Sequence, residues 1–177
     1  RSSSNSLDAR PAPERIASRP GTRRGPGRTP WTRSMPLYFA YGANMDAGAM
    51  AARCPRSTLI GQGRLNRHRF IIMREGYASV VRDPRATVHG ILWDLALGDV
   101  PALDRYEGVA SGLYIKAMQP VSVPGGSKRA LIYLGGTSAT GAPRPGYLEA
   151  VLAAATAAQL PAAYRAELQA WQRGRAG

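Results

Sequence analysis

Short β-prone segments, broken by glycine and proline and not separated by long helices, constrain the fold of this 177-residue chain more than any other feature. Apolar and β-branched residues predict strands at 37–41, 57–73 with a break near 61–63, 78–82, 87–95, and a hairpin of 113–123 and 128–134 joined by PGGS. A doubly wound parallel sheet needs a long crossover between strands, and this pattern does not provide one. We therefore expect an α+β domain in which a small mixed or antiparallel β-barrel carries peripheral α-helices.

Helix signals lie between and after these strands. Asp46 precedes a short helix over 47–53, where its carboxylate is placed to accept the first backbone N–H groups. The segment GDVPALDRYEG at 98–108 predicts a second short helix, with Asp99 at its N-cap and Gly108 just past its C-terminus. Two alanine-rich helices are expected near the end of the chain, over 146–158 and 161–173.

Residues 1–34 form a leader rich in Ser, Pro, Gly and Arg that shows no apolar periodicity. Such a segment buries too little apolar surface to offset its ordering entropy, so we expect it to be disordered. We expect one folded domain over 35–173, which starts at Met35 directly before the first strand. The sequence leaves open whether Met35 is the true start and whether the leader is native, and the leader shows no secretory signal.

The net charge of +13 raises the question of a nucleic-acid partner. Eight arginines against Asp8 and Glu14 give the leader alone +6, so the rest of the chain carries +7 and is only moderately basic. The charge therefore does not favour nucleic acid as the main partner of the folded domain.

The cysteine and histidine content limits metal and disulfide chemistry. A single cysteine, Cys54, excludes an internal disulfide, and with only two histidines a Cys/His zinc site is not expected. The longest uncharged apolar run, 150–164, contains Pro161 and is too short to span a bilayer. We expect a cytoplasmic protein without metal or membrane contact, and the oligomeric state is left open.

The stretch MPLYFAYGANMDAGAM at 35–50 predicts an anion-binding turn. A buried strand ends at Tyr41 and the chain then enters Gly42, Ala43 and Asn44 before the next helix. Successive backbone N–H groups in such a post-strand turn bind anions regardless of side chain. Two simpler interpretations stand beside this one, in which Gly42 permits a left-handed turn and Asn44 caps local backbone.

Glu107 is the candidate acid/base group. It falls at the last turn of the helix expected over 98–108, where the helix dipole disfavours a negative charge. Its neighbours in the sequence are apolar or aromatic, so a position in an apolar cleft would raise its pKa towards the range of a general base. The simpler interpretation is a solvated charge at a helix end.

Together, YFAYGANM at 38–45 and LDRYEGVASGLY at 103–114 resemble the γ-glutamylcyclotransferase family. Its members carry a Tyr-Gly-Ser-Asn type loop after the first strand, then a Glu-Gly dipeptide with a tyrosine seven residues after the glutamate. The resemblance extends over about 36–172 and includes VHGILWDL, ALIYL and PGYLEAVLAAA. It implies a γ-glutamylcyclotransferase-like fold, which related plant avirulence-induced proteins share.

The resemblance also implies a reaction and its residues. The α-amine of a γ-glutamyl group attacks its own γ-carbonyl, closes 5-oxoproline and releases an amine, without a cofactor. Glu107 is then the catalytic general acid/base. The implied substrate contacts are Tyr38, Phe39, Ala40, Tyr41, Gly42, Ala43, Asn44, Tyr114 and Tyr147. Ala43 departs from the usual family serine, so we expect that position to act through its backbone N–H.

Two other functions remain as alternatives: a non-catalytic relative that binds a small acidic metabolite, and a nucleic-acid-associated protein that acts through its basic leader. The leaving group is also open, and a free amino acid, a polyamine, a γ-glutamyl-protected intermediate and a glutamyl–lysine isopeptide all fit the sequence.

Overall fold

The computed structural model describes residues 36–174, and the expected leader and its boundary at Met35 lie outside them. The strands are β1 Leu37–Ala40, β2 Thr58–Ile72, β3 Ala78–Asp94, β4 Tyr114–Val123 and β5 Gly126–Gly135. The α-helices are α1 Ala47–Arg53, α2 Val100–Tyr106, α3 Tyr147–Ala157 and α4 Ala162–Ala170. Short 3₁₀ helices cover Ala43–Met45, Leu97–Asp99, Val109–Ser111 and Trp171–Arg173.

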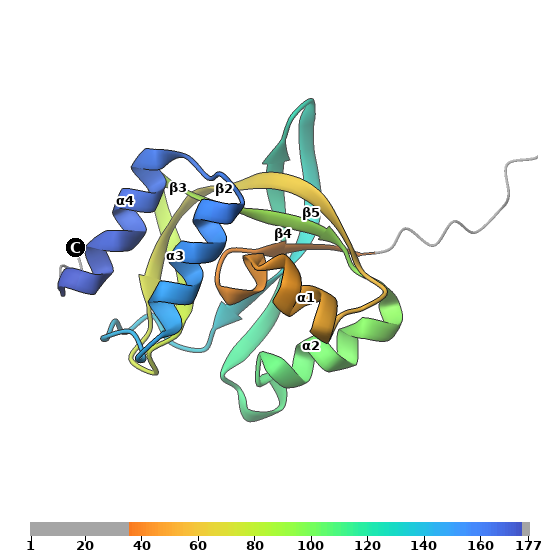
Figure 1. Cartoon of the computed structure of the whole chain (residues 1–177), viewed down its shortest axis with the longest axis horizontal. Helices are drawn as coiled ribbons and strands as arrows, with labels where there is room; N and C mark the ends of the chain where they lie inside the picture. The colour runs from red at the N-terminus through yellow and green to blue at the C-terminus, as the bar shows by residue number, and fades with distance from the viewer. Residues whose placement is uncertain (1–35, 175–177) are drawn as a thin grey trace, which may run out of the picture. The chain divides into compact units, whose positions relative to one another are not determined.

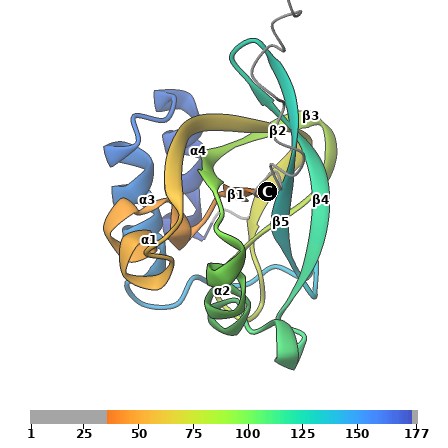
Figure 2. The same cartoon turned by 90° about the vertical axis from the view of Figure 1, so that its right-hand side faces the viewer.

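The strands form a closed barrel in the order β1-β3-β2-β4-β5. Neighbours pair antiparallel except β1 and β5, which pair in parallel at Tyr38 and Leu131. This confirms the predicted α+β class and the mixed barrel. Figure 1 and Figure 2 show α1, α3 and α4 gathered on one side of the barrel and α2 at one of its ends.

The segments 78–82 and 87–95, expected as two strands, are one continuous strand, β3. Both of its halves pair with β2, on either side of a register shift. Asn66 pairs with Thr87 and His68 pairs with Arg82, so Arg67 alone lies opposite residues 83–86. Arg67 has a φ of 61°, and this irregularity accommodates Pro84, which has no N–H to donate.

The break expected near 61–63 is a second irregularity inside β2 rather than a strand end. The register shifts between Leu59 and Gly61, and Gly61 adopts a φ of 151°, which favours glycine. The four predicted helices and the hairpin of β4 and β5 are confirmed within a few residues at each end.

Two caps fix the helices on either side of the site. Asp46 caps α1 as predicted, because its Oδ1 accepts the N–H of Ala49 at 2.6 Å. Gly108 ends α2 as predicted, with a φ of 62°. Asp99 stands at the N-cap position of α2, but its side chain does not bond to the helix. It accepts hydrogen bonds from Arg56 and Ser57 instead.

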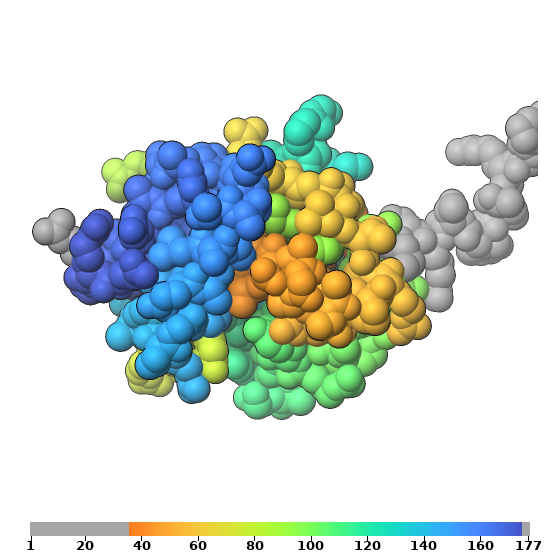
Figure 3. Space-filling view, in the orientation of Figure 1, coloured from red at the N-terminus to blue at the C-terminus, as the bar shows by residue number. Residues whose placement is uncertain are grey.

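The core fills the barrel and continues beneath the helices. Phe39, Leu92 and Ile132 are fully buried, and Leu103 and Met50 anchor α2 and α1 to the same apolar cluster. Figure 3 shows the segment that contains α1 at the surface, between α3 and the segment that contains α2. Among residues 36–174, no helix is both long and apolar enough to cross a membrane.

Candidate active site

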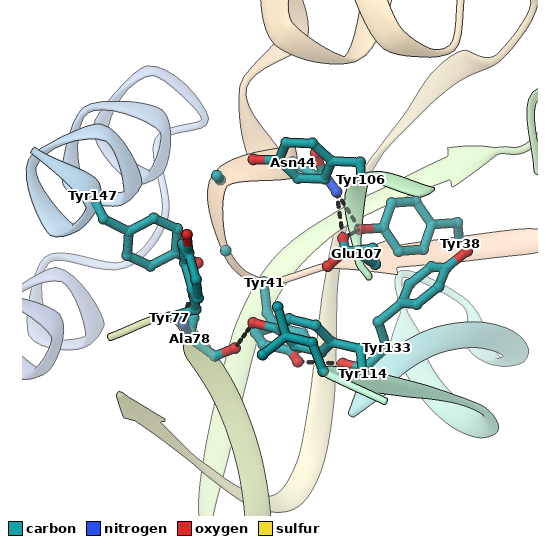
Figure 4. A pocket seen from close by; sticks show the side chains of 13 residues that line it. Tyr38, Tyr41, Asn44, Tyr77, Ala78, Tyr106, Glu107, Tyr114, Tyr133 and Tyr147 are labelled. Carbon is teal, nitrogen blue, oxygen red and sulfur yellow. Dashed lines mark hydrogen bonds between the residues drawn. The ribbon is translucent and has the colours of Figure 1, made fainter. Parts of the chain in front are cut away.

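A cavity of about 170 Å³ opens beside the end of β1. Seven of its thirteen lining residues are tyrosines and one is a carboxylate, Glu107. The lining residues are Tyr38, Tyr41, Gly42, Ala43, Asn44, Tyr77, Ala78, Tyr106, Glu107, Leu113, Tyr114, Tyr133 and Tyr147. Figure 4 shows Glu107 with Asn44, Tyr106 and Tyr38 on one side, and Tyr147, Tyr77 and Ala78 across from them.

The end of α2 positions Glu107. Its backbone N–H donates to the Leu103 carbonyl at 2.9 Å, so Glu107 is the C-cap of the helix. The next residue, Gly108, takes the left-handed conformation that turns the chain away, and its carbonyl accepts the N–H of Leu113 at 3.1 Å. A helix end anchored on buried Leu103 thereby holds the carboxylate at the cavity wall.

The carboxylate of Glu107 is hydrogen-bonded inside the protein. Its Oε1 accepts from Asn44 Nδ2 at 2.7 Å and from the Tyr38 hydroxyl at 3.5 Å. Burial raises the pKa of Glu107 to about 7, although the Arg53 charge and these two hydrogen bonds act in the opposite direction. A carboxyl group with this pKa takes up and releases a proton near neutral pH.

The structure corrects the interpretation that Asn44 caps local backbone, because its side chain is buried and bonds to other side chains. Besides Glu107, its Nδ2 donates to the Tyr38 hydroxyl at 3.0 Å. Its Oδ1 accepts a hydrogen bond from the guanidinium of Arg53, the last residue of α1. The same guanidinium lies 3.3 Å from the centre of the Tyr106 ring.

The turn after β1 does not need the left-handed conformation that one interpretation gave Gly42. Gly42 has φ −119° and ψ −141°, and the reason for glycine is space. A Cβ at this position would lie 2.9 Å from the Tyr147 hydroxyl oxygen. The turn itself is closed by the N–H of Met45, which donates to the Gly42 carbonyl at 3.0 Å.

Tyr114 and Tyr147 both reach the cavity, and both bond to the backbone of Ala78 rather than to Glu107. The Tyr114 hydroxyl donates to the Ala78 carbonyl, and the Tyr147 hydroxyl accepts the Ala78 N–H at 3.2 Å. Burial raises the pKa of both phenols, so both stay protonated at neutral pH. Together they hold the start of β3 against the cavity.

The comparisons with known proteins agree on one family. A model of the AIG2-like family matches residues 87–168. γ-Glutamylcyclotransferases of Mus musculus and Homo sapiens are 28% and 26% identical over 145 residues, which cover 76% of this chain and 77% of each relative. The solved structure of a γ-glutamyl cyclotransferase superposes with a TM-score of 0.71 at 25% identity, over 76% of this chain and 86% of that one.

The chain is similar in sequence and in fold to the γ-glutamylcyclotransferase-like family. Its barrel and peripheral helices are the fold of that family, and the match covers most of the part of the chain that the structure describes.

The structure brings most of the residues expected from this family together. Glu107, Tyr114 and Tyr147 line the cavity, as do five of the seven expected contacts in 38–44. Phe39 and Ala40 do not. Both are buried in the core, where Phe39 is fully buried and Ala40 is 1% exposed.

Five lining residues of the cavity were not predicted as site residues from the sequence: Tyr77, Ala78, Tyr106, Leu113 and Tyr133. Tyr106 and Leu113 lie in the segment that carries Glu107, so that segment alone points to them. Tyr77 lies in the turn just before β3 and Tyr133 lies in β5, and only the closure of the barrel brings them to the site. In residues 36–174, no group of three His, Cys, Asp or Glu side chains is arranged to hold a metal ion.

Proposed function

We propose that this chain is a cofactor-independent γ-glutamylcyclotransferase, which converts a γ-glutamyl amino acid or amine to 5-oxoproline and the free amine. The observation that carries the proposal is Glu107, a carboxylate with a pKa of about 7, held by Asn44 and Tyr38 at the wall of a tyrosine-lined cavity. The mammalian relatives named above carry the name of this activity.

The reaction needs no group beyond the substrate and a proton carrier. A bond forms between the substrate's α-nitrogen and its γ-carbonyl carbon, and the amide C–N bond of that carbon breaks. No atom changes its oxidation state. Because nucleophile and electrophile belong to one molecule, the protein must hold the γ-glutamyl chain curled, and a small enclosed cavity does so.

Glu107 moves the proton in this proposal. The substrate's α-ammonium group has no free electron pair until it loses a proton, and an ionised Glu107 takes that proton. Protonated Glu107 then gives it to the nitrogen of the leaving amine. The ring nitrogen loses a second proton on becoming the lactam N–H, and the released amine carries that proton away as an ammonium group, so the enzyme returns to its starting state. Proton transfer by a positioned group contributes about 10²–10⁴ in rate. The pKa of about 7 suits both directions of transfer.

The groups that could bind the negative charges of the substrate are neutral hydrogen-bond donors. None of the thirteen lining residues is Lys or Arg. The backbone of Gly42–Asn44 and the phenols of the cavity are therefore the candidates to bind the α-carboxylate and the oxyanion of the tetrahedral intermediate. One well-placed oxyanion donor contributes about 10²–10³ in rate. Backbone donors do not depend on a serine, which agrees with alanine at position 43.

Tyr114 and Tyr147 have a supporting role in this proposal. Both hydroxyls are engaged with Ala78, so they shape the wall opposite Glu107 instead of orienting its carboxylate. Tyr38 and Asn44 orient it. We also propose a cytoplasmic location, which the cysteine content led us to expect.

The direct test is incubation of the full chain with γ-glutamyl-alanine and measurement of 5-oxoproline. Glu107→Gln keeps an oxygen that accepts from Asn44 and loses the proton carrier, so we expect activity to fall by about 10²–10⁴. Glu149→Gln, an exposed position in the first turn of α3, is the matched control and retains activity. Full activity in Glu107→Gln removes Glu107 from the mechanism.

The same experiment separates catalysis from binding alone. Thermal stabilisation by γ-glutamyl-alanine with no lactam formed identifies a non-catalytic metabolite-binding protein. A panel of γ-glutamyl amino acids, γ-glutamyl polyamines and glutamyl–lysine isopeptides, scored by lactam release, then identifies the leaving group.

A further inference from the structure

Arg53 contacts both residues that flank Glu107, although it does not line the cavity. Its guanidinium donates to Asn44 Oδ1 on one side and lies 3.3 Å from the centre of the Tyr106 ring on the other. Asn44 bonds directly to Glu107, and Tyr106 precedes it in the chain. The C-terminal ends of α1 and α2 are therefore joined through one side chain.

The contact with Arg53 decides which way the Asn44 amide faces. An asparagine amide carries one oxygen that accepts and one nitrogen that donates, whereas a guanidinium only donates. Arg53 therefore binds Oδ1, which leaves Nδ2 directed at Glu107 and Tyr38. In the opposite orientation Oδ1 would face an ionised carboxylate, and two acceptors would be opposed.

The charge of Arg53 acts on Glu107 without a direct ion pair. Among the ion pairs of residues 36–174, none joins these two side chains within 4.0 Å. A cation in direct contact commonly lowers a carboxyl pKa by about 1–3 units, which would make Glu107 a weak base. Placed behind Asn44, Arg53 offsets only part of the effect of burial.

We propose that Arg53 is a positioning residue for the proposed reaction: its guanidinium orients the Asn44 amide towards Glu107 and supports the partly ionised carboxylate. The inference rests on the proposed function of Glu107, but it concerns a residue outside the cavity. Its consequence is that loss of Arg53 raises the pH at which Glu107 becomes ionised.

Phenols are the other titratable groups that face Glu107, and they come from every neighbouring element. They are Tyr38 of β1, Tyr41 just after it, Tyr77 just before β3, Tyr106 of α2, Tyr114 of β4, Tyr133 of β5 and Tyr147 of α3. Burial raises the pKa of five of them, Tyr38, Tyr41, Tyr114, Tyr133 and Tyr147, so none of these five titrates near pH 7. Arg53 is therefore the group whose removal changes the charge near Glu107 in this range.

The test is a titration of the Glu107 carboxyl by ¹³C NMR on the full chain labelled in glutamate Cδ, with the signal assigned by its absence in Glu107→Gln. Arg53→Met removes both charge and donor, and we expect the pKa of Glu107 to rise by about one unit. Arg53→Lys keeps a cationic donor and restores most of the shift. Arg105→Met removes an exposed charge from the last turn of α2 and leaves the pKa unchanged.

A second variant keeps the test decisive if Arg53→Met does not fold. Tyr106 is 48% exposed, so Tyr106→Ala removes the ring that supports Arg53 with little loss of core. We expect a smaller upward shift in the pKa of Glu107, and no shift in Tyr106→Phe, which keeps the ring. Unchanged titration of Glu107 in both Arg53→Met and Tyr106→Ala overturns the inference.

The kinetic readout separates this inference from the proposed function. If lactam forms, the acidic limb of the kcat/KM profile in Arg53→Met moves to higher pH, and the rate at pH 6 falls about tenfold while rates at high pH converge. If no variant and no wild-type chain forms lactam, yet the titration moves, the proposed activity fails and the positioning role stands. Lactam formation with an unmoved titration rejects the role of Arg53 alone.

Discussion

Asn44 Nδ2 lies 2.7 Å from Glu107 Oε1, although 63 positions of the chain separate the two residues. One follows the first strand of the barrel and the other caps a helix at the barrel end. Neither segment holds a carboxylate in a defined position by itself. Closure of the barrel and the anchoring of α1 and α2 on the core bring them together, so in this protein the site is a product of the whole fold.

The first prediction concerns the pH dependence of lactam formation. A general base works only when ionised, and burial sets the pKa of Glu107 at about 7. We expect kcat/KM for γ-glutamyl-alanine to rise with pH through an apparent pKa near 7. The profile is measured between pH 5 and 9 by 5-oxoproline release. An acidic limb near the ordinary glutamate value of 4.5 contradicts the assignment.

The second prediction concerns stability. The pKa of Glu107 is raised on folding, so the folded state binds this proton more tightly than the unfolded state does. Its contribution is therefore favourable at low pH and is lost as pH rises from 4.5 to about 7. A shift of this size corresponds to about 3 kcal/mol.

Glu107→Gln should remove this penalty, because glutamine stays neutral. We expect the variant to be more stable than the wild type at pH 8, by up to about 3 kcal/mol in urea unfolding. The advantage should shrink towards pH 4.5. Equal pH dependence of the two proteins would show that Glu107 is not buried in solution.

Most of the fold was predictable because its signals are local. The cap at Asp46, the glycine at position 108 and the hairpin turn each fix a nearby backbone conformation, and each was recognised. The two errors in the strands have one cause. The gap left at 83–86, which contains Pro84, and the break expected near 61–63 are both irregularities that a long barrel strand absorbs in its register.

One motif supplied both residue and position for Glu107 and for the turn at 42–44, and all of these residues line the cavity. Phe39 and Ala40 are buried and do not line the cavity, because a motif does not say which of its side chains pack into the core. Arg53 and Tyr133 were missed because their contacts are tertiary. The bond from Asn44 to Glu107 was not foreseen, because nothing near Asn44 in the sequence points to a partner 63 positions away.

The third prediction tests the space beside Gly42. An added Cβ would lie 2.9 Å from the Tyr147 hydroxyl oxygen and 3.4 Å from the Ala78 Cβ. Gly42→Ala must therefore displace Tyr147 and weaken its 3.2 Å hydrogen bond from the Ala78 N–H. We expect a loss of about 1–3 kcal/mol in unfolding free energy and a lower kcat/KM.

Tyr147→Phe supplies the matched test of that clash, because it removes the oxygen that the new methyl group meets. The stability loss caused by Gly42→Ala should be smaller in the Tyr147→Phe background than in the wild type. Additive losses in the double variant would place the effect of Gly42→Ala elsewhere, in the backbone of the turn.

The fourth prediction concerns Asp99, which lies at the N-terminal end of α2, away from the carboxylate of Glu107 at the other end. Asp99 is 2% exposed, and its carboxylate accepts from the Arg56 N–H at 2.9 Å and the Ser57 hydroxyl at 2.8 Å. Burial alone would raise the pKa of Asp99, but the hydrogen bonds from Ser57 and Arg56 and the Arg56 charge outweigh it, so the pKa lies below its ordinary 3.8. The stabilisation is therefore present above pH 3.8 and is lost as pH falls through the lower folded value.

Asp99→Asn replaces one charged acceptor with an amide, and we expect it to lower the unfolding free energy at pH 7 by about 1–3 kcal/mol. The difference from wild type should narrow below pH 3.8, where Asp99 becomes protonated in the unfolded chain. Asp99 precedes α2 and Glu107 follows it, so the acidic limb of kcat/KM should stay near 7 in the folded variant. A limb that moves with Asp99→Asn would mean that the N-terminal end of α2 controls the Glu107 carboxylate, and that Asn44, Tyr38 and Arg53 are not sufficient to hold it.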